Sequence, residues 1–259
     1  MIVVGDRMTA PAETVPSDAR AADIMKLLEG RRISAVPVVE GGRLVGIVST
    51  TDLVRALATN ADRNISAARV MTSPVVVASP DEPLDEAAWR LVAARVHRLI
   101  VAKDDRPVGV LSARDILAEL VRRRPTAPIR AIMTSPVETV AVDDTIDEAI
   151  AKLASAGVHG LVVLDGAFPV GVFTHAEALA ARNLPSKLRK GPVEGHMSYE
   201  TICLDVATPI HRATAYSMAM NVRRILVVEQ RHLVGILSAI DLVGVLARMP
   251  TDEPAAAAT

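Results

Sequence analysis

Four stretches of the chain place a hydroxyl side chain three residues before a carboxylate. An ionised aspartate offers only hydrogen-bond acceptors, and its two oxygens match the cis hydroxyls of a ribose. A hydroxyl that caps a helix leaves the N–H groups and positive dipole end of the first turn available to a phosphate. The pattern therefore predicts nucleotide binding. Each stretch starts with a glycine, and the four are Gly46–Asp52, Gly109–Asp115, Gly171–Glu177 and Gly235–Asp241.

The same spacing also fits a capping box, in which the first and fourth residues satisfy each other's backbone donors. Such a cap stabilises a helix by about 1 kcal/mol and needs no ligand. A repeated protein would carry its caps in every copy, so recurrence supports the fold more directly than it supports binding. The leading glycine, which lacks a Cβ atom, indicates that another group approaches the strand closely.

The four copies are unequal. The third copy has Glu177, which is one methylene longer than the aspartate of the other copies, and we expect this site to be degenerate. The first copy adds a second hydroxyl, Thr51, and is the best candidate for a complete site. The candidate residues are Ser49, Thr51 and Asp52 in the first copy, Ser112, Arg114 and Asp115 in the second, and Ser238 and Asp241 in the fourth.

The stretches belong to a tandem repeat, because their glycines are separated by 63, 62 and 64 residues. A Met-Thr or Met-Ser pair begins 38 residues before each glycine, at Met8, Met71, Met133 and Met197. We therefore expect four domains, at residues 1–60, 66–124, 129–183 and 193–248, and a disordered tail at 249–259.

Each repeat predicts the order β-α-β-β-α. In the first repeat, Ile24, Leu27 and Leu28 have helical spacing, and the apolar runs 36–39 and 44–48 are joined by a glycine-rich turn that predicts a hairpin. One such unit cannot cover its own sheet. We expect an α+β (α/β) fold in which repeats pair sheet to sheet with the helices outside.

The Met-Thr start, the segment 32–39 and the glycine-to-acid stretch resemble the CBS domain, named after cystathionine β-synthase. The resemblance covers nearly the whole chain. It implies two Bateman modules, repeats 1+2 and 3+4, that form a pseudo-two-fold disc within a monomer, as in the gamma subunit of AMP-activated protein kinase, or across a homodimer. It also implies a non-catalytic regulator without an obligatory cofactor, which senses AMP, ADP, ATP or S-adenosylmethionine and signals to an effector protein in trans.

The resemblance also implies roles for single residues. The acid holds the ribose, the hydroxyl residue and the residue before the acid lie near the phosphates, and the base enters a slot lined by Val75, Val76 and Ile100. Thr72 and Thr134, from the Met-Thr pairs, are counted with the ligand residues. Basic residues at one shared position are expected to reach phosphates in a central cavity, and the alternative is a solvated strand start. They are His97, Arg98, Arg223 and Arg224.

Composition bears on the possible partners and location of the protein. The 29 basic and 30 acidic residues give a net charge of −1, so no overall field attracts nucleic acid or an anionic membrane. The apolar runs are shorter than the roughly 20 residues of a membrane span. The N-terminus does not resemble a signal peptide and Cys203 is the single cysteine, which favours the cytoplasm. The histidines lack metal-ligand spacing. A scaffold with vestigial sites and a nucleic-acid module using the linker patches Arg122–Arg124 and Lys187–Lys190 remain the alternatives.

Overall fold

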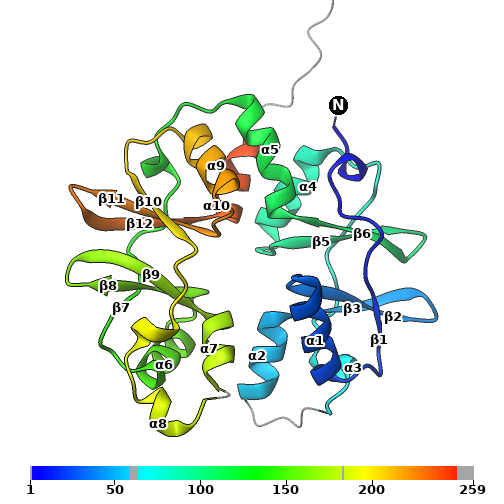
Figure 1. Cartoon of the computed structure of the whole chain (residues 1–259). Helices are drawn as coiled ribbons and strands as arrows, with labels where there is room; N and C mark the ends of the chain where they lie inside the picture. The colour runs from blue at the N-terminus through cyan, green and yellow to red at the C-terminus, as the bar shows by residue number, and fades with distance from the viewer. Residues whose placement is uncertain (1, 59–63, 183, 250–259) are drawn as a thin grey trace, which may run out of the picture. The chain divides into compact units, whose positions relative to one another are not determined.

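The computed structural model describes residues 2–58, 64–182 and 184–249. The chain divides into two units, one of Met1–Leu120 with Val243–Thr259 and one of Val121–Leu242. Repeat 1 and repeat 2 as far as Leu120 lie in the first unit, and the second contains repeat 3 and repeat 4 as far as Leu242 (Figure 1). Of the expected tail, residues 250–259 lie outside the described part of the chain.

Repeat 1 has the expected order of elements. Strand β2 pairs in parallel with β1 and antiparallel with β3, which gives a three-stranded sheet. Each of the other repeats also contributes a three-stranded sheet. Gly41 and Gly42 join β2 to β3 with φ angles of 56° and 80°, which is the left-handed conformation of a tight hairpin turn. The elements are η1 (Val4–Asp6), β1 (Val15–Pro16), α1 (Ala21–Arg31), β2 (Ala35–Glu40), β3 (Arg43–Ser49) and α2 (Thr50–Ala58).

The other repeats follow the same order, which confirms the predicted fold class. Repeat 2 has α3 (Ala67–Val70), β4 (Val77–Ala78), α4 (Leu84–Ala93), β5 (Arg98–Lys103), β6 (Arg106–Ser112) and α5 (Ala113–Arg123). Repeat 3 has η2 (Ile129–Ala131), β7 (Thr139–Ala141), α6 (Ile146–Ala156), β8 (Gly160–Asp165), β9 (Phe168–Thr174) and α7 (His175–Arg182). After α8 (Ser186–Arg189) in the connection, repeat 4 has η3 (Val193–His196), β10 (Thr201–Asp205), α9 (Ile210–Ala219), β11 (Arg224–Glu229), β12 (His232–Ser238) and α10 (Ala239–Leu246).

Paired repeats exchange their first segments. We call the residues that end at each Met-Thr or Met-Ser pair the entry segment of the repeat. In the first unit, Thr9 of repeat 1 bridges to Val110 of repeat 2, and Thr72 of repeat 2 bridges to Ile47 of repeat 1. Repeats 3 and 4 repeat the exchange through the bridges Thr134 to Ile236 and Ser198 to Val172. The exchange confirms the pairing of repeats into modules 1+2 and 3+4.

The glycine of each stretch faces the methionine of the exchanged entry segment. A Cβ atom at Gly46 would lie 2.3 Å from the sulfur of Met71, and one at Gly235 would lie 2.5 Å from the sulfur of Met133. Real Cβ contacts are longer, so a side chain at these positions would displace the methionine. The close approach indicated by the glycines is therefore made by the paired repeat.

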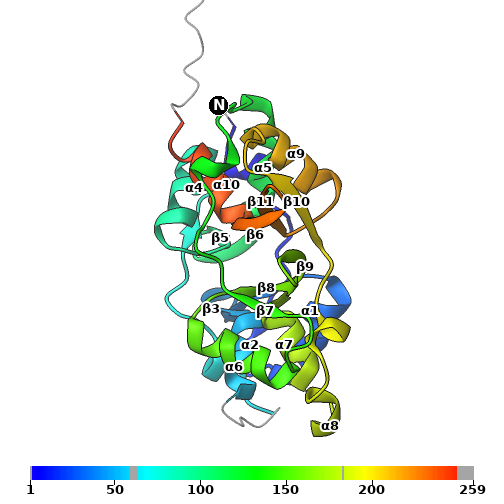
Figure 2. The same cartoon turned by 90° about the vertical axis from the view of Figure 1, so that its left-hand side faces the viewer.

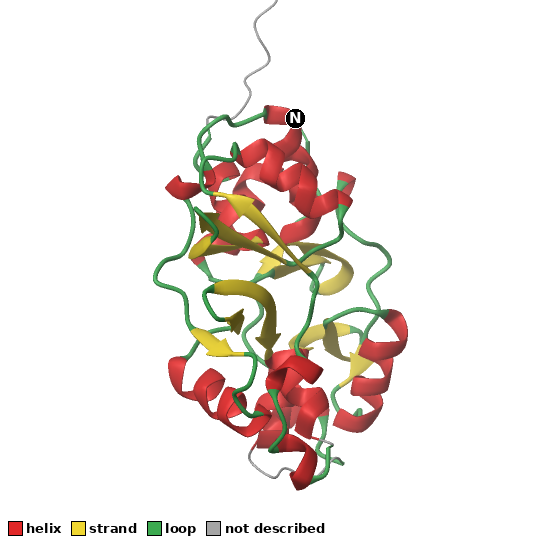
Figure 3. Cartoon of the chain, turned by 60° about the vertical axis from the view of Figure 1, so that its left-hand side comes forward, coloured by secondary structure: helices red, strands yellow, loops and turns green. Residues whose placement is uncertain are grey.

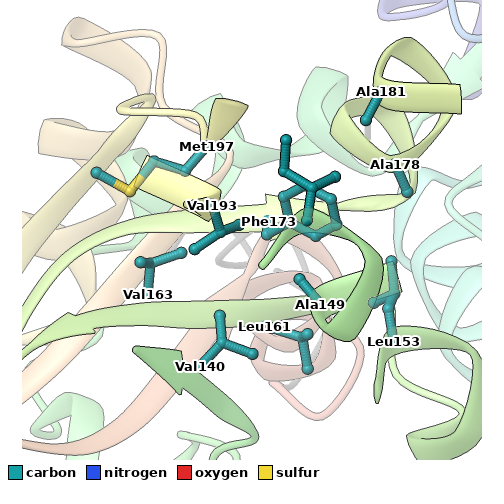
Figure 4. Packing of buried hydrophobic residues seen from close by; sticks show 11 residues of the cluster. Val140, Ala149, Leu153, Leu161, Val163, Phe173, Ala178, Ala181, Val193 and Met197 are labelled. Carbon is teal, nitrogen blue, oxygen red and sulfur yellow. The ribbon is translucent and has the colours of Figure 1, made fainter. Parts of the chain in front are cut away.

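The core of the second unit joins residues of both of its repeats. Leu161, Phe173 and Leu153 of repeat 3 pack with Val193 and Met197 from the entry segment of repeat 4 (Figure 4). A second cluster, which includes Val162, Val172 and Leu226, connects the two sheets of this unit.

The second unit has helices on the outer sides of its two sheets. Helices α6 and α7 lie on the outer side of the sheet β7–β9, and α9 lies on the outer side of the sheet β10–β12 (Figures 1 and 2). Figure 3 distinguishes the helices, in red, from the strands, in yellow.

Candidate ligand site at the second helix of each repeat

Each second helix begins directly after the hydroxyl residue of its stretch. In repeat 1, Asp52 Oδ2 accepts hydrogen bonds from the backbone N–H and the hydroxyl of Ser49, at 2.8 and 2.5 Å. The Asp52 N–H donates to Ser49 Oγ at 3.2 Å, which completes a capping box. Asp115 Oδ2 accepts the same two bonds from Ser112 at 2.7 and 2.7 Å.

Repeats 3 and 4 have the same arrangement. Asp241 Oδ2 accepts from the N–H and hydroxyl of Ser238 at 2.7 and 2.7 Å, and Glu177 Oε2 accepts from those of Thr174 at 2.9 and 2.5 Å. Helix capping is thus present in all four copies. It engages one carboxylate oxygen in each, and since a carboxylate has about four acceptor positions, capping leaves the other oxygen available to a ligand.

Asp52 differs from its equivalents because its second oxygen is also engaged. The Thr72 hydroxyl, from the entry segment of repeat 2, donates to Asp52 Oδ1 at 2.9 Å, and Arg55 Nη1 lies 3.9 Å from the same oxygen. The Asp52 residue is only 7% exposed. Asp115 and Asp241 are half-buried, and within the described residues their Oδ1 atoms accept no hydrogen bond.

The structure places the remaining predicted residues around these carboxylates. Thr51 and Arg114 are half-buried in the first turns of α2 and α5. Thr134 exchanges backbone hydrogen bonds with Ile236 of β12, two residues before Ser238, at 2.9 and 3.1 Å. Of the expected base slot, Val75 and Val76 are half-buried, whereas Ile100 is fully buried in the core.

The basic position lies opposite the capping serine in two of the sheets. Arg98 on β5 is the register partner of Ser112, and Arg224 on β11 is the register partner of Ser238. The Arg98 guanidinium donates a hydrogen bond to the Ser34 hydroxyl, so it reaches from repeat 2 into repeat 1. His97 and Arg223, one residue earlier, are exposed.

Arg224 is partly removed from water inside the second unit. Its burial lowers the pKa of the guanidinium from the usual range, while the negative charges of Asp241 and Glu177 act in the opposite direction. The guanidinium nevertheless retains its charge, because an arginine side chain is too basic to lose its proton in a protein. The second unit therefore holds a cation in the field of both of its glycine-to-acid carboxylates.

Two features of the site were not deduced from sequence: the hydrogen bond from Thr72 to Asp52 and the contact of Arg98 with Ser34. Both connect different repeats. The constant interval between methionine and glycine aligns the repeats with one another. The interval does not depend on whether each methionine packs against the glycine of the same repeat or against that of the paired repeat. No spacing in the chain distinguishes the two arrangements.

Comparison with known proteins agrees with this architecture. A model of the CBS domain matches residues 4–59, 67–122, 129–183 and 193–248. The chain therefore belongs to the CBS-domain family. Within the described residues, no group of three or more metal-binding side chains is suited to hold a metal ion, and no helix has the length and apolar character to cross a bilayer.

Curated relatives match parts of the chain. An uncharacterized 33.4 kDa protein in a ribosomal RNA operon of Thermofilum pendens is 29% identical over 177 residues, which are 63% of this chain and 58% of that protein. An L-aspartate semialdehyde sulfurtransferase of Methanocaldococcus jannaschii is 33% identical over 116 residues, 44% of this chain and 22% of the enzyme. The relatives thus include an enzyme, and in both cases the chain spans less than two thirds of the relative.

Solved structures resemble the whole chain or half of it. One is a Methanocaldococcus jannaschii protein proposed to be an archaeal homologue of g-AMPK. The match covers 95% of this chain and 100% of that protein, with a TM-score of 0.83 and 14% sequence identity. This likeness shows the fold. A CBS-domain pair of the same organism, solved with 5′-methylthioadenosine and S-adenosyl-L-methionine, covers 48% of this chain and 98% of its own at 29% identity and a TM-score of 0.44.

Proposed function

We propose that this protein is a non-catalytic, cytoplasmic sensor of adenosine-containing ligands. The observation that carries the proposal is the geometry of Asp115 and Asp241: each carboxylate is fixed by its cap through Oδ2, while Oδ1 accepts no bond from the described residues. A fixed, half-buried carboxylate with a free oxygen is suited to receive the hydroxyls of a ribose. Membership of the CBS-domain family supports the same class of ligand.

The surroundings of the carboxylate suit the rest of a nucleotide. The N-terminus of the second helix favours a phosphate, and Arg98 or Arg224 lies across the strand pair from the capping serine. AMP, ADP and ATP present both ribose and phosphate, and S-adenosylmethionine presents the ribose with a cationic sulfur instead. The ligand-bound state is proposed to act on an effector protein in trans.

Thermal unfolding with AMP, ADP, ATP and S-adenosylmethionine tests the proposal. A ligand that binds the folded state raises the unfolding temperature, by an amount that grows with its concentration relative to the dissociation constant. We expect at least one of the four to produce this shift. A full panel without a shift at millimolar concentration would contradict the sensor and favour an interaction scaffold.

Replacing the carboxylates tests their role directly. Asp115→Asn and Asp241→Asn should each weaken binding at the altered site by about 10- to 150-fold, the equivalent of losing a charge-assisted hydrogen bond of about 1.5–3 kcal/mol. Isothermal titration calorimetry with the ligand that gave the largest shift measures this loss.

The chain offers a matched control for the change from a carboxylate to an amide in a helix cap. Glu148 in α6 forms the same three hydrogen bonds with Thr145 that Asp52 forms with Ser49, in a capping box outside the glycine-to-acid stretches. Glu148→Gln should leave ligand affinity unchanged while making the same carboxylate-to-amide change in an equivalent cap. If the aspartate variants and Glu148→Gln all retain full affinity, the carboxylates serve the fold alone.

A further inference from the structure

The four glycine-to-acid carboxylates share their cap but differ in a second contact. Only the Asp52 carboxylate receives a hydroxyl from the paired repeat, through Thr72, when the described residues are compared. Thr9, Thr134 and Ser198 occupy the equivalent positions, and none of them donates a side-chain hydrogen bond to the acid of its paired repeat.

The contact changes how many acceptor positions Asp52 has left. Oδ2 already accepts two hydrogen bonds from Ser49, and Oδ1 accepts one from Thr72. Because each carboxylate oxygen offers about two acceptor positions, one remains. The cis-diol of a ribose donates two hydrogen bonds, so it can bind Asp52 fully only by replacing the Thr72 hydroxyl. At Asp115 both positions on Oδ1 are available.

We infer that the Thr72 hydroxyl competes with the ribose diol for Asp52, so that the first site of the module binds adenosine ligands more weakly than the Asp115 site. The inference rests on the proposed function, since it concerns the same carboxylates and the same ligands. It makes Thr72 a residue that sets the order of occupancy: Asp115 fills first, and Asp52 fills at higher ligand concentration.

Thr72 can be altered without removing the backbone hydrogen bonds that hold its entry segment. Its residue is exposed, and its backbone exchanges hydrogen bonds with Ile47 at 2.9 and 3.1 Å that do not involve the side chain. Thr72→Val removes the hydroxyl and keeps the branched shape. Thr72→Ser keeps the hydroxyl and serves as the rescue variant.

The experiment measures AMP affinity by calorimetry in the full-length chain with Asp115→Asn and Asp241→Asn, a background in which Asp52 is the remaining aspartate of the four stretches. Adding Thr72→Val should tighten AMP binding about two- to twelve-fold, the range given by a net hydrogen bond of about 0.5–1.5 kcal/mol. Thr72→Ser should retain the affinity of the background. Thr9→Val makes the same change on the other entry segment and should alter nothing.

A second probe separates competition from a change of shape. The nucleotide 2′-deoxy-AMP has one ribose hydroxyl and can use the single open position on Asp52 without displacing Thr72. The gain from Thr72→Val should therefore be absent with 2′-deoxy-AMP. An equal gain with both nucleotides would assign the effect to packing and overturn the inference.

The outcomes distinguish this inference from the proposed function. If wild-type protein binds AMP but Thr72→Val leaves the affinity of the background unchanged or weakens it, Thr72 does not compete and the sensor proposal stands. If wild-type protein binds AMP and the background does not, Asp52 is no site and the inference fails alone. If AMP binds to neither wild type nor any variant, the adenine-nucleotide function fails and the inference fails with it.

Discussion

At the residue scale, each carboxylate of the four stretches uses one oxygen to cap its helix. The second oxygen is hydrogen-bonded to Thr72 at Asp52 and accepts no hydrogen bond from the described residues at Asp115 and Asp241. Asp52, Asp115 and Asp241 fix their helix starts through one oxygen, and the second oxygen distinguishes them. The sequence indicated both capping and ligand binding as alternatives. The geometry shows that they are compatible, because they use different atoms of the same side chain.

A glycine substitution tests the packing of the paired repeats. A Cβ atom at Gly171 would lie 2.8 Å from the Met197 sulfur and 2.8 Å from the Ser198 carbonyl oxygen. Gly171→Ala should therefore lower the free energy of unfolding by about 1–3 kcal/mol, as overpacking in a filled core does. Thermal and urea unfolding measure the change.

Gly30 provides the control for this substitution. It lies inside helix α1, and no atom lies within 4 Å of the position of its missing Cβ. Gly30→Ala should stabilise the protein by about 0.5–1 kcal/mol, because alanine favours a helix interior more than glycine does. Equal destabilisation by both substitutions would contradict the packing role of Gly171.

At the element scale, the strands, helices and turns of each repeat could be predicted from the sequence. Helical spacing located α1 around Ile24 and Leu28, and the glycine pair at 41–42 located the hairpin of β2 and β3. Strand β4 contains only Val77 and Ala78, although the preceding Val75 and Val76 are also β-branched. Strand length depends on the pairing partner, which a local pattern does not specify.

The entry segments are the elements whose position could not be predicted. Ile129 of η2 is fully buried, and its N–H donates to the Thr208 carbonyl of repeat 4 at 2.9 Å. Ile129→Ala should lower the free energy of unfolding by about 2–5 kcal/mol, as expected for a large apolar side chain removed from a core.

Leu188 of α8 is the matched control, because it lies in another connecting segment of the same unit and is 53% exposed. Leu188→Ala should change the free energy of unfolding by less than about 0.5 kcal/mol. Calorimetric unfolding of both variants measures the difference. Comparable effects at the two positions would mean that the entry segment of repeat 3 contributes little to the core.

At the scale of the whole chain, the repeats predict how many ligands bind. Repeats 1, 2 and 4 carry aspartate, and repeat 3 carries Glu177, whose longer side chain forms the cap at Thr174. Native mass spectrometry of the chain with AMP should detect no more than three nucleotides. Glu177→Gln should leave that number unchanged, and a fourth nucleotide that disappears in this variant would contradict the degenerate assignment.

The exchange of entry segments also affects how the chain folds during translation. The segment that contains Met8 and Thr9 is synthesised about 100 residues before its partners Gly109 and Val110. At roughly 5–20 residues per second, this delay amounts to some 5–20 s. Throughout that time the Met8 side chain lacks its packing partner at Gly109. A nascent chain of this protein therefore exposes surfaces to chaperones and proteases that the finished module covers.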